Sequence, residues 1–255
     1  MSGPGNFRQR VLAGEWLGGA FVNLGSSLTA EIAGRSGFDW LVVDHEHGPG
    51  GEETLLHQLQ AIASTPAVPI VRIANNETVR FKRALDLGAA GVMVPYVNTV
   101  EEARAAVAAV RFPPHGIRGV AKSTRAALFG QEFDSYYGHA HERLITMAQI
   151  ETPEAVEQAA AIAAVDGVDV LFVGPVDLTT HYGVPGKFDD PRFVAARKAV
   201  VAAARKAGKA AGILTLLPEQ VALVRAEGYT MVTFGSDGGT VTSGLRQCAG
   251  VVRGK

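Results

Sequence analysis

Four ionisable side chains in a row follow an apolar run early in the chain. The apolar residues Leu41–Val43 lead into Asp44, His45, Glu46 and His47, and a Gly-Pro pair comes next. A buried strand that ends in this way presents polar side chains at its C-terminal end, which in a barrel of parallel strands carries the catalytic groups. Because histidine titrates near neutrality, His45 or His47 is the expected acid/base. Their spacing alone does not separate the two.

Two further candidate strands deliver carboxylates at their C-terminal ends, at Glu151 and Asp177. Two such groups at one end of a barrel form a hard oxygen site that suits Mg²⁺ or Mn²⁺. Taken singly, each is equally compatible with an acidic residue at a helix start, and their joint placement favours a metal. One cysteine excludes a zinc site built on thiolates, whereas a histidine-rich site through His45 and His47 stays open.

A buried arginine and a buried amide are expected beside these carboxylates. Arg72 lies in the apolar segment Pro-Ile-Val-Arg-Ile, and a buried arginine must be paired. It is either a structural partner of Asp44 or, as we favour, an oxyanion stabiliser. Gln149 either binds substrate or satisfies a neighbouring strand. Composition alone places Asp86 on a solvated helix face.

These residues need a scaffold that brings strand ends together. Near-continuous apolar runs, typical of strands covered on both faces, predict eight strands: Leu17–Val22, Trp40–Asp44, Pro69–Ile73, Gly91–Pro95, Leu144–Ile150, Val168–Val173, Ala211–Leu214 and Met231–Phe234. Helical patterns alternate with them: Glu52–Ser64, Glu77–Leu87, Val100–Val110, Pro153–Val165, Arg192–Ala207 and Pro218–Glu227. The alternation predicts a (β/α)₈ TIM barrel, an α/β fold. The rival doubly wound sheet usually has a glycine-rich turn after its first strand, and none is present.

Length and composition fit one domain over residues 1–255. The 255 residues are 47% hydrophobic with a net charge of −1, so neither a nucleic-acid partner nor a membrane is expected. The N-terminus lacks the apolar segment of a secretory signal, and the one cysteine, Cys248, fits a reducing compartment. These features predict a cytoplasmic protein.

Two stretches interrupt the regular pattern. Residues Phe112–His141 form a long irregular insertion between the fourth and fifth strands, and a loop of that length is usually functional or an interface. The glycine-rich Gly235–Gly239 follows the last strand, where some barrels bind phosphate. The loop after the seventh strand has no matching cradle, so the phosphate signal is weak.

Several motifs occur together in the order found in one known family. They are Phe38-Asp-Trp-Leu-Val-Val-Asp44-His-Glu-His47-Gly-Pro, Pro69-Ile-Val-Arg72, Gly91-Val-Met-Val-Pro95, Gln149-Ile-Glu151-Thr and Phe172-Val-Gly174-Pro-Val-Asp177-Leu. From about Trp16 to Asp237 the chain resembles the HpcH/HpaI aldolases, which are class II, metal-dependent pyruvate aldolases. The resemblance implies a homo-oligomeric barrel, commonly a hexamer built as a trimer of dimers, with a divalent metal such as Mg²⁺, Mn²⁺ or Co²⁺.

The resemblance also assigns the metal and substrate positions. The Glu of Gln-x-Glu and the Asp of Gly-Pro-x-Asp hold the metal in the family, and they correspond to Glu151 and Asp177. It places Gln149, Gly174 and the backbone near Val176 against the substrate.

The resemblance further assigns the groups that move protons and stabilise charge. The family histidine corresponds to His47 rather than His45, and the enolate-stabilising arginine corresponds to Arg72. The acidic residue of the next helix corresponds to Asp86, which the family pattern implicates in tuning the histidine. Two positions depart from the pattern: His45 stands where relatives often have glycine, and Arg125 lies in altered surroundings where relatives have a substrate-facing arginine.

The expected activity is the cleavage or formation of 4-hydroxy-2-oxoacids. Pyruvate and an aldehyde would be the products, through a metal-stabilised pyruvate enolate, in the catabolism of aromatic compounds or sugar acids. One alternative is a lyase of acyl-CoA substrates like the citrate lyase β subunit, for which no clear basic CoA site is visible. Another is a non-catalytic barrel that binds a keto acid.

Overall fold

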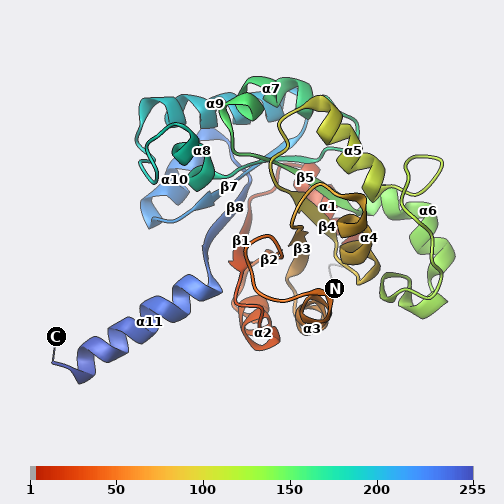
Figure 1. Ribbon diagram of the computed structural model, residues 1–255, viewed down its shortest axis with the longest axis horizontal. Helices are drawn as coiled ribbons and strands as arrows, with labels where there is room; N and C mark the ends of the chain where they lie inside the picture. The colour runs from red at the N-terminus through yellow and green to blue at the C-terminus, as the bar shows by residue number, and fades with distance from the viewer. Residues whose placement is uncertain (1–3, 255) are drawn as a thin grey trace.

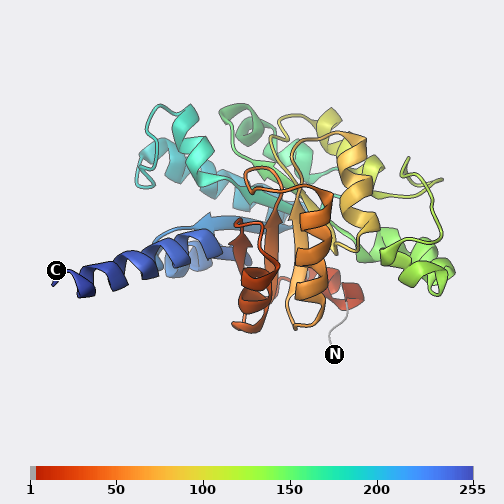
Figure 2. The ribbon, with the colours of Figure 1, turned by 60° about the horizontal axis from the view of Figure 1, so that its bottom comes forward.

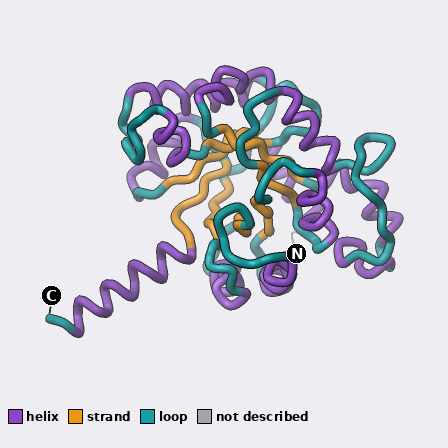
Figure 3. The backbone as a smooth tube through the Cα atoms, viewed as in Figure 1, coloured by secondary structure: helices purple, strands orange, loops and turns teal. Residues whose placement is uncertain are grey.

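Eight parallel strands close into one barrel with helices around it (Figures 1 and 3). The computed structural model describes residues 4–254. Each strand pairs with the next in sequence, and β8 pairs with β1 to complete the ring. The strands are β1 (Leu17–Val22), β2 (Trp40–Asp44), β3 (Val68–Arg72), β4 (Gly91–Val94), β5 (Ile145–Ile150), β6 (Val170–Val173), β7 (Ala210–Thr215) and β8 (Met231–Ser236). The predicted (β/α)₈ fold is confirmed.

The helices follow the strands in the order expected of this fold. They are α1 (Pro4–Leu12), α2 (Ser27–Arg35), α3 (Glu52–Ala63), α4 (Thr78–Asp86), α5 (Val100–Val110), α6 (Phe133–Arg143), α7 (Pro153–Ala163), α8 (Pro175–His181), α9 (Pro191–Lys206), α10 (Pro218–Glu227) and α11 (Asp237–Val252), with a 3₁₀ helix η1 (Arg125–Gly130). All eight predicted strands and all six predicted helices are present, with ends that differ by no more than two residues.

Local capping chemistry explains several of these helix boundaries. The Thr99 side chain accepts the N–H of Glu102, and the Glu102 carboxylate accepts the N–H of Thr99, which forms a capping box at the start of α5. Thr152 caps α7 ahead of a proline at its first position. Gly228 ends α10 with a φ of 103°, a left-handed conformation that favours glycine.

One end of the barrel is closed by the N-terminal helix. Phe7 and Val11 of α1 are buried with residues that fill the barrel interior, among them Trp40 and Phe172. Arg8 pairs with the buried Asp169 at 2.7 Å, just before β6. Because α1 covers the N-terminal ends of the strands, the opposite end, called the mouth below, is the one that presents functional groups.

The two irregular stretches are more ordered than the sequence predicts. The expected loop Phe112–His141 contains η1 and most of α6. Tyr136 and Tyr137 of α6 pack on Phe112, so tertiary contacts favour a helix that the polar sequence does not announce. The expected Gly235–Gly239 loop is the end of β8 and the start of α11, with Asp237 bonded to the Asn23 N–H and the Thr29 hydroxyl.

The last helix leaves the barrel. α11 follows β8 directly and projects away from the other elements (Figures 1 and 2). None of its residues is buried, and Leu245, Val251 and Val252 are among its exposed apolar side chains. Cys248, also on α11, is exposed. Within residues 4–254, no helix is both long and apolar enough to cross a membrane.

The barrel interior makes a sharp prediction about two adjacent glycines. A Cβ at Gly19 would lie 2.7 Å from the buried Trp40 indole, whereas a Cβ at Gly18 would meet nothing within 4 Å. We expect Gly19→Ala to lower the free energy of unfolding by about 1–3 kcal/mol through overpacking. Gly18→Ala, the control on the same strand, should stay near wild type. Urea unfolding of both variants tests this, and equal stabilities would show that the indole moves freely.

Candidate active site

A buried ion pair joins the ends of two neighbouring strands at the mouth. Asp44 ends β2 and Arg72 ends β3, and the two are register partners. Arg72 Nε donates to Asp44 Oδ1 at 3.0 Å and Nη2 donates to Oδ2 at 2.7 Å. Arg72 Nη1 also lies 3.2 Å from Glu46 Oε2. Asp44 is therefore the structural partner that the sequence suggested for Arg72, and Glu46 is a second acidic neighbour.

The same aspartate holds the following loop. Asp44 Oδ1 accepts the N–H groups of Glu46 and His47 at 3.1 and 3.2 Å. Burial by itself raises the pKa of Asp44, but the hydrogen bonds and charge of Arg72, helped by these two N–H groups, bring it below its usual value. Asp44 is therefore a carboxylate at neutral pH, and it orients both Arg72 and the backbone that carries His47.

The two candidate histidines have different surroundings. His47 is exposed, and its Nε2 lies 3.8 Å from Glu46 Oε2, beside the Arg72 cluster. His45 is partly buried, and its Nε2 lies 3.3 Å from Oε1 of Gln58 on α3. Burial lowers the pKa of His45. The structure thus separates two residues that spacing could not, and it gives no support to a zinc site that they would share.

Tyr96, which the sequence did not single out, contacts both Glu151, directly after β5, and Asp177, in the first turn of α8. Glu151 Oε1 accepts the N–H of Tyr96 at 2.9 Å, and the Tyr96 hydroxyl donates to Asp177 Oδ1 at 3.1 Å. Gln149 Nε2 donates to Glu151 Oε2. Tyr96 has a φ of 50°, which is unusual for a non-glycine residue and is often associated with functional sites. Its position directly after the Gly-Val-Met-Val-Pro motif was the available signal.

Negative charge is concentrated at this point of the mouth. Burial raises the pKa of Glu151 to about 7, and the charges of Asp177 and Glu46 act in the same direction, against the N–H of Tyr96 and the charge of Arg72. Burial also raises the pKa of Glu46, with Arg72 and His47 opposing it. A cation between Glu151 and Asp177 would offset both the burial of these carboxylates and their mutual repulsion.

The local geometry fits a bound cation at these carboxylates. Oε1 of the buried Gln149 has no hydrogen-bond partner within the described chain, so an acceptor is left over. A Cβ at Gly174 would overlap the Glu151 carboxylate, so the glycine leaves that group its space. Among residues 4–254, no three His, Cys, Asp or Glu side chains gather to hold a metal by themselves. Two protein carboxylates with water and substrate would suit Mg²⁺ or Mn²⁺.

Two residues assigned by resemblance lie away from the mouth. Asp86 ends α4 before β4 begins, and it pairs with the fully buried Arg118 at 2.7 Å. Arg125 donates to the carbonyl oxygens of Leu87 and Leu59. Asp86 is partly buried beside the Arg118 guanidinium rather than freely solvated, and its role in tuning the histidine stays a prediction. Within one chain neither Asp86 nor Arg125 contacts His47 or the carboxylates. Arg118 holds Asp86, and carbonyl oxygens at the end of α4 and within α3 hold Arg125.

Gly174 and Val176 lie where a substrate could meet backbone groups. Gly174 precedes α8, Pro175 occupies its first position, and Val176 and Asp177 follow in the first turn. The first N–H groups of a helix have no partner inside it. The Val176 side chain is exposed. The structure thus brings Asp44, Glu46, His47, Arg72, Gln149, Glu151, Gly174, Val176 and Asp177 to one end of the barrel.

Comparison with known proteins identifies the family. Residues 18–244 match the family described as HpcH/HpaI aldolase/citrate lyase. The chain is 45% identical over 210 residues to a pyruvate aldolase of Rhizobium etli, with 82% of each chain covered. It is 39% identical to a 5-keto-4-deoxy-D-glucarate aldolase of an Enterobacter species, with 96% of each covered. A crystal structure of a family member from Burkholderia cenocepacia matches with a TM-score of 0.93, at 37% identity, covering 98% of this chain and 99% of that one.

The chain belongs to the HpcH/HpaI aldolase/citrate lyase family. The resemblance drawn from the strand-end motifs is therefore confirmed, and the chain is an enzyme of the lyase class.

The Asp44–Arg72 pair predicts a pH-dependent stability. Since folding lowers the pKa of Asp44, its contribution is complete above the unfolded value of about 4 and is lost as pH falls through the folded value. At pH 7 we expect Asp44→Asn to cost about 3–5 kcal/mol, because Arg72 stays buried without its charged partner. The difference in unfolding free energy between Asp44→Asn and wild type should narrow as pH falls below about 4, toward and through the lower folded pKa of Asp44.

Urea midpoints at a series of pH values measure this gap. Asp189→Asn, at an exposed position, is the control and should show a small and constant difference. A constant gap for Asp44→Asn would show that the Asp44 charge is not what stabilises the pair.

Proposed function

We propose that this enzyme cleaves 4-hydroxy-2-oxoacids to pyruvate and an aldehyde, and forms them in reverse. The observation that carries the proposal is the meeting of two kinds of group at one mouth. Arg72 supplies a buried cation with fixed orientation, and Glu151 and Asp177 supply paired carboxylates beside it. The relatives named pyruvate aldolase and 5-keto-4-deoxy-D-glucarate aldolase support the same class of reaction.

A divalent metal would be held by Glu151 and Asp177. When bound, it would act as a Lewis acid that polarises the keto group of the substrate. Gln149 and the backbone N–H groups at the start of α8 lie next to these carboxylates, and they would bind the oxygens of the oxoacid. Tyr96, which contacts both carboxylates, would keep them in place.

His47 would move the proton of the reaction. It accepts the proton of the 4-hydroxyl group, the C4–O bond becomes the carbonyl of the aldehyde, and the C3–C4 bond breaks. The electron pair of that bond forms the enolate of pyruvate, whose negative charge the Arg72 guanidinium stabilises. A proton returned to C3 completes pyruvate. Glu46 lies between Arg72 and His47, at 3.2 Å from an Arg72 nitrogen and 3.8 Å from His47 Nε2, and would help to orient the imidazole.

Exchange of the methyl protons of pyruvate with D₂O tests this proposal. We expect Glu151→Gln and Asp177→Asn each to slow exchange at least about a hundredfold, since each removes a charged metal ligand. EDTA should abolish wild-type exchange, and added Mg²⁺ or Mn²⁺ should restore it. Glu154→Gln, at an exposed position on α7, is the control and should exchange at the wild-type rate.

Other outcomes would favour other mechanisms. Activity that survives EDTA, with borohydride trapping pyruvate on the protein, would indicate a Schiff base. No exchange in the wild type with any metal would favour the non-catalytic barrel. Where metal-dependent exchange is observed, a screen of aldehydes with pyruvate in the synthetic direction would identify the aldehyde substrate.

We also propose that the chain works as a homo-oligomer, built as a hexamer of three dimers. An apolar cavity of about 180 Å³ lies on the outside of the barrel beside α2, β8 and the start of α11. Ile32, Phe38, Phe234 and Val241 line it. α11 buries none of its 16 residues, and an isolated helix of that length is only marginally stable in water. A second copy of this chain packed on both surfaces would cover them.

A charge on α11 should weaken that assembly. Leu245 is 66% exposed, and replacing it with Asp removes an apolar contact worth about 1.5–3 kcal/mol, which raises the dissociation constant about tenfold or more. Light scattering across a dilution series measures the shift. Leu223→Asp, an exposed leucine on α10, is the control. A wild-type chain that is monomeric at micromolar concentration would contradict the oligomer.

A further inference from the structure

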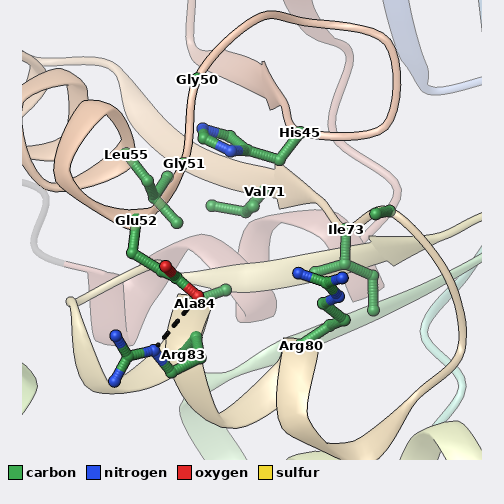
Figure 4. A pocket seen from close by; sticks show the side chains of 11 residues that line it. His45, Gly50, Gly51, Glu52, Leu55, Val71, Ile73, Arg80, Arg83 and Ala84 are labelled. Carbon is green, nitrogen blue, oxygen red and sulfur yellow. Dashed lines mark hydrogen bonds and ion pairs between the residues drawn. The ribbon is translucent and has the colours of Figure 1, made fainter.

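A second cavity lies between α3 and α4, on the outer side of the barrel wall (Figure 4). Its volume is about 110 Å³. Val71 and Ile73 line it, and they alternate along the chain with Arg72, so they lie on the opposite face of β3 from Arg72. The wall of the barrel therefore separates this cavity from the mouth. The remaining lining residues include His45, Gly50, Gly51, Glu52, Arg80 and Arg83.

The lining is positively charged. Arg80 and Arg83 lie on α4, and Glu52 is the single carboxylate among the lining residues. Arg83 Nε bonds to Glu52 Oε1 at 3.4 Å, and both side chains are about half exposed, so the pair is weak. Within residues 4–254, Arg80 forms no side-chain hydrogen bond or ion pair. The Arg80 guanidinium is therefore available to an anion in this cavity.

His45 and the start of α3 border the same space. The imidazole of His45 projects into the cavity beside Gly50 and Gly51 in Figure 4. Gly51 precedes α3 and provides no side-chain cap, so N–H groups of the first turn are free for another acceptor. Nε2 of the buried Gln58, whose Oε1 lies beside the His45 ring, has no hydrogen-bond partner within the described chain. The donors on this side of the cavity are therefore the N–H groups at the start of α3, and Gln58 lies behind the imidazole.

We propose that this cavity binds a small dianion, a phosphate or a short dicarboxylate, and that its occupancy changes the rate at the mouth. Arg80 is the principal ligand, with Arg83 and the N–H groups at the start of α3 beside it, and the His45 imidazole forms part of the cavity wall. The effect on rate rests on the proposed aldolase function, whereas the binding does not. This site accounts for a histidine that the proposed reaction leaves without a role.

A short peptide connects the cavity to the reacting groups. The N–H of His45 donates to the Arg72 carbonyl at 2.9 Å, and the next two N–H groups donate to Asp44. A ligand that moves the His45 side chain therefore acts on the segment that places His47. No longer path is needed, because His45 and His47 belong to the same loop.

Calorimetric titration of inorganic phosphate and, separately, of succinate tests the binding. We expect saturable binding of one of them to the wild type and a dissociation constant about tenfold higher in Arg80→Gln, from loss of a charge-assisted hydrogen bond. Arg104→Gln, an exposed arginine on α5, is the matched control and should bind as the wild type does. The tighter of the two anions identifies the class of ligand.

Pyruvate proton exchange, measured with and without the anion, tests the link to the mouth. We expect the anion to change the rate in the wild type and to leave it unchanged in Arg80→Gln at the same concentration. Three outcomes would overturn the proposal: no saturable binding, equal weakening in Arg80→Gln and Arg104→Gln, or an exchange rate that ignores the bound anion. Loss of exchange with binding intact would instead count against the aldolase function.

Discussion

The buried pair of Asp44 and Arg72 is the interaction on which the arrangement of the mouth depends. A guanidinium with little exposure is stable only where its charge is matched and its donors are satisfied. Asp44 does both through two hydrogen bonds, and its remaining acceptor capacity holds the N–H groups of the next two loop residues. One carboxylate therefore fixes the guanidinium and the backbone that carries His47. A shift of the guanidinium would leave a buried charge unpaired, and a shift of the backbone would break its two hydrogen bonds to Asp44.

The rest of the mouth has more negative charge than this pair can balance. Burial raises the pKa of Glu46 and of Glu151, the negative charge of Asp177 adds to both shifts, and the positive charge of Arg72 opposes both. Such a site is poorly suited to stand alone and well suited to receive a cation. Tyr96 bonds to both Glu151 and Asp177, to the first through its N–H and to the second through its hydroxyl. The strained backbone at Tyr96 is the conformational cost of contacting both.

The sequence predicted those features that depend on local pattern. Buried parallel strands are continuously apolar, so their ends could be placed within two residues, and polar residues at those ends were expected at the mouth. Tyr96 was missed because an aromatic residue after a strand has no distinctive spacing. α6 was missed because its stability comes from Phe112, far from it in sequence. The places of Asp86 and Arg125 depend on Arg118 and on two helix carbonyls, contacts that no local pattern encodes.

The loop after β2 shows how one strand end can serve two separate spaces. Asp44 and His47 contribute to the mouth, whereas His45 lies against α3 on the outer side of the wall. A glycine at position 45 would leave the outer cavity without its imidazole and would not alter the Asp44 contacts. In the proposed anion site, His45 therefore adds a wall to the outer cavity and takes the place of none of the Asp44 contacts. Because the same short peptide borders both spaces, a charge bound on the outside would act on the groups that handle the proton on the inside.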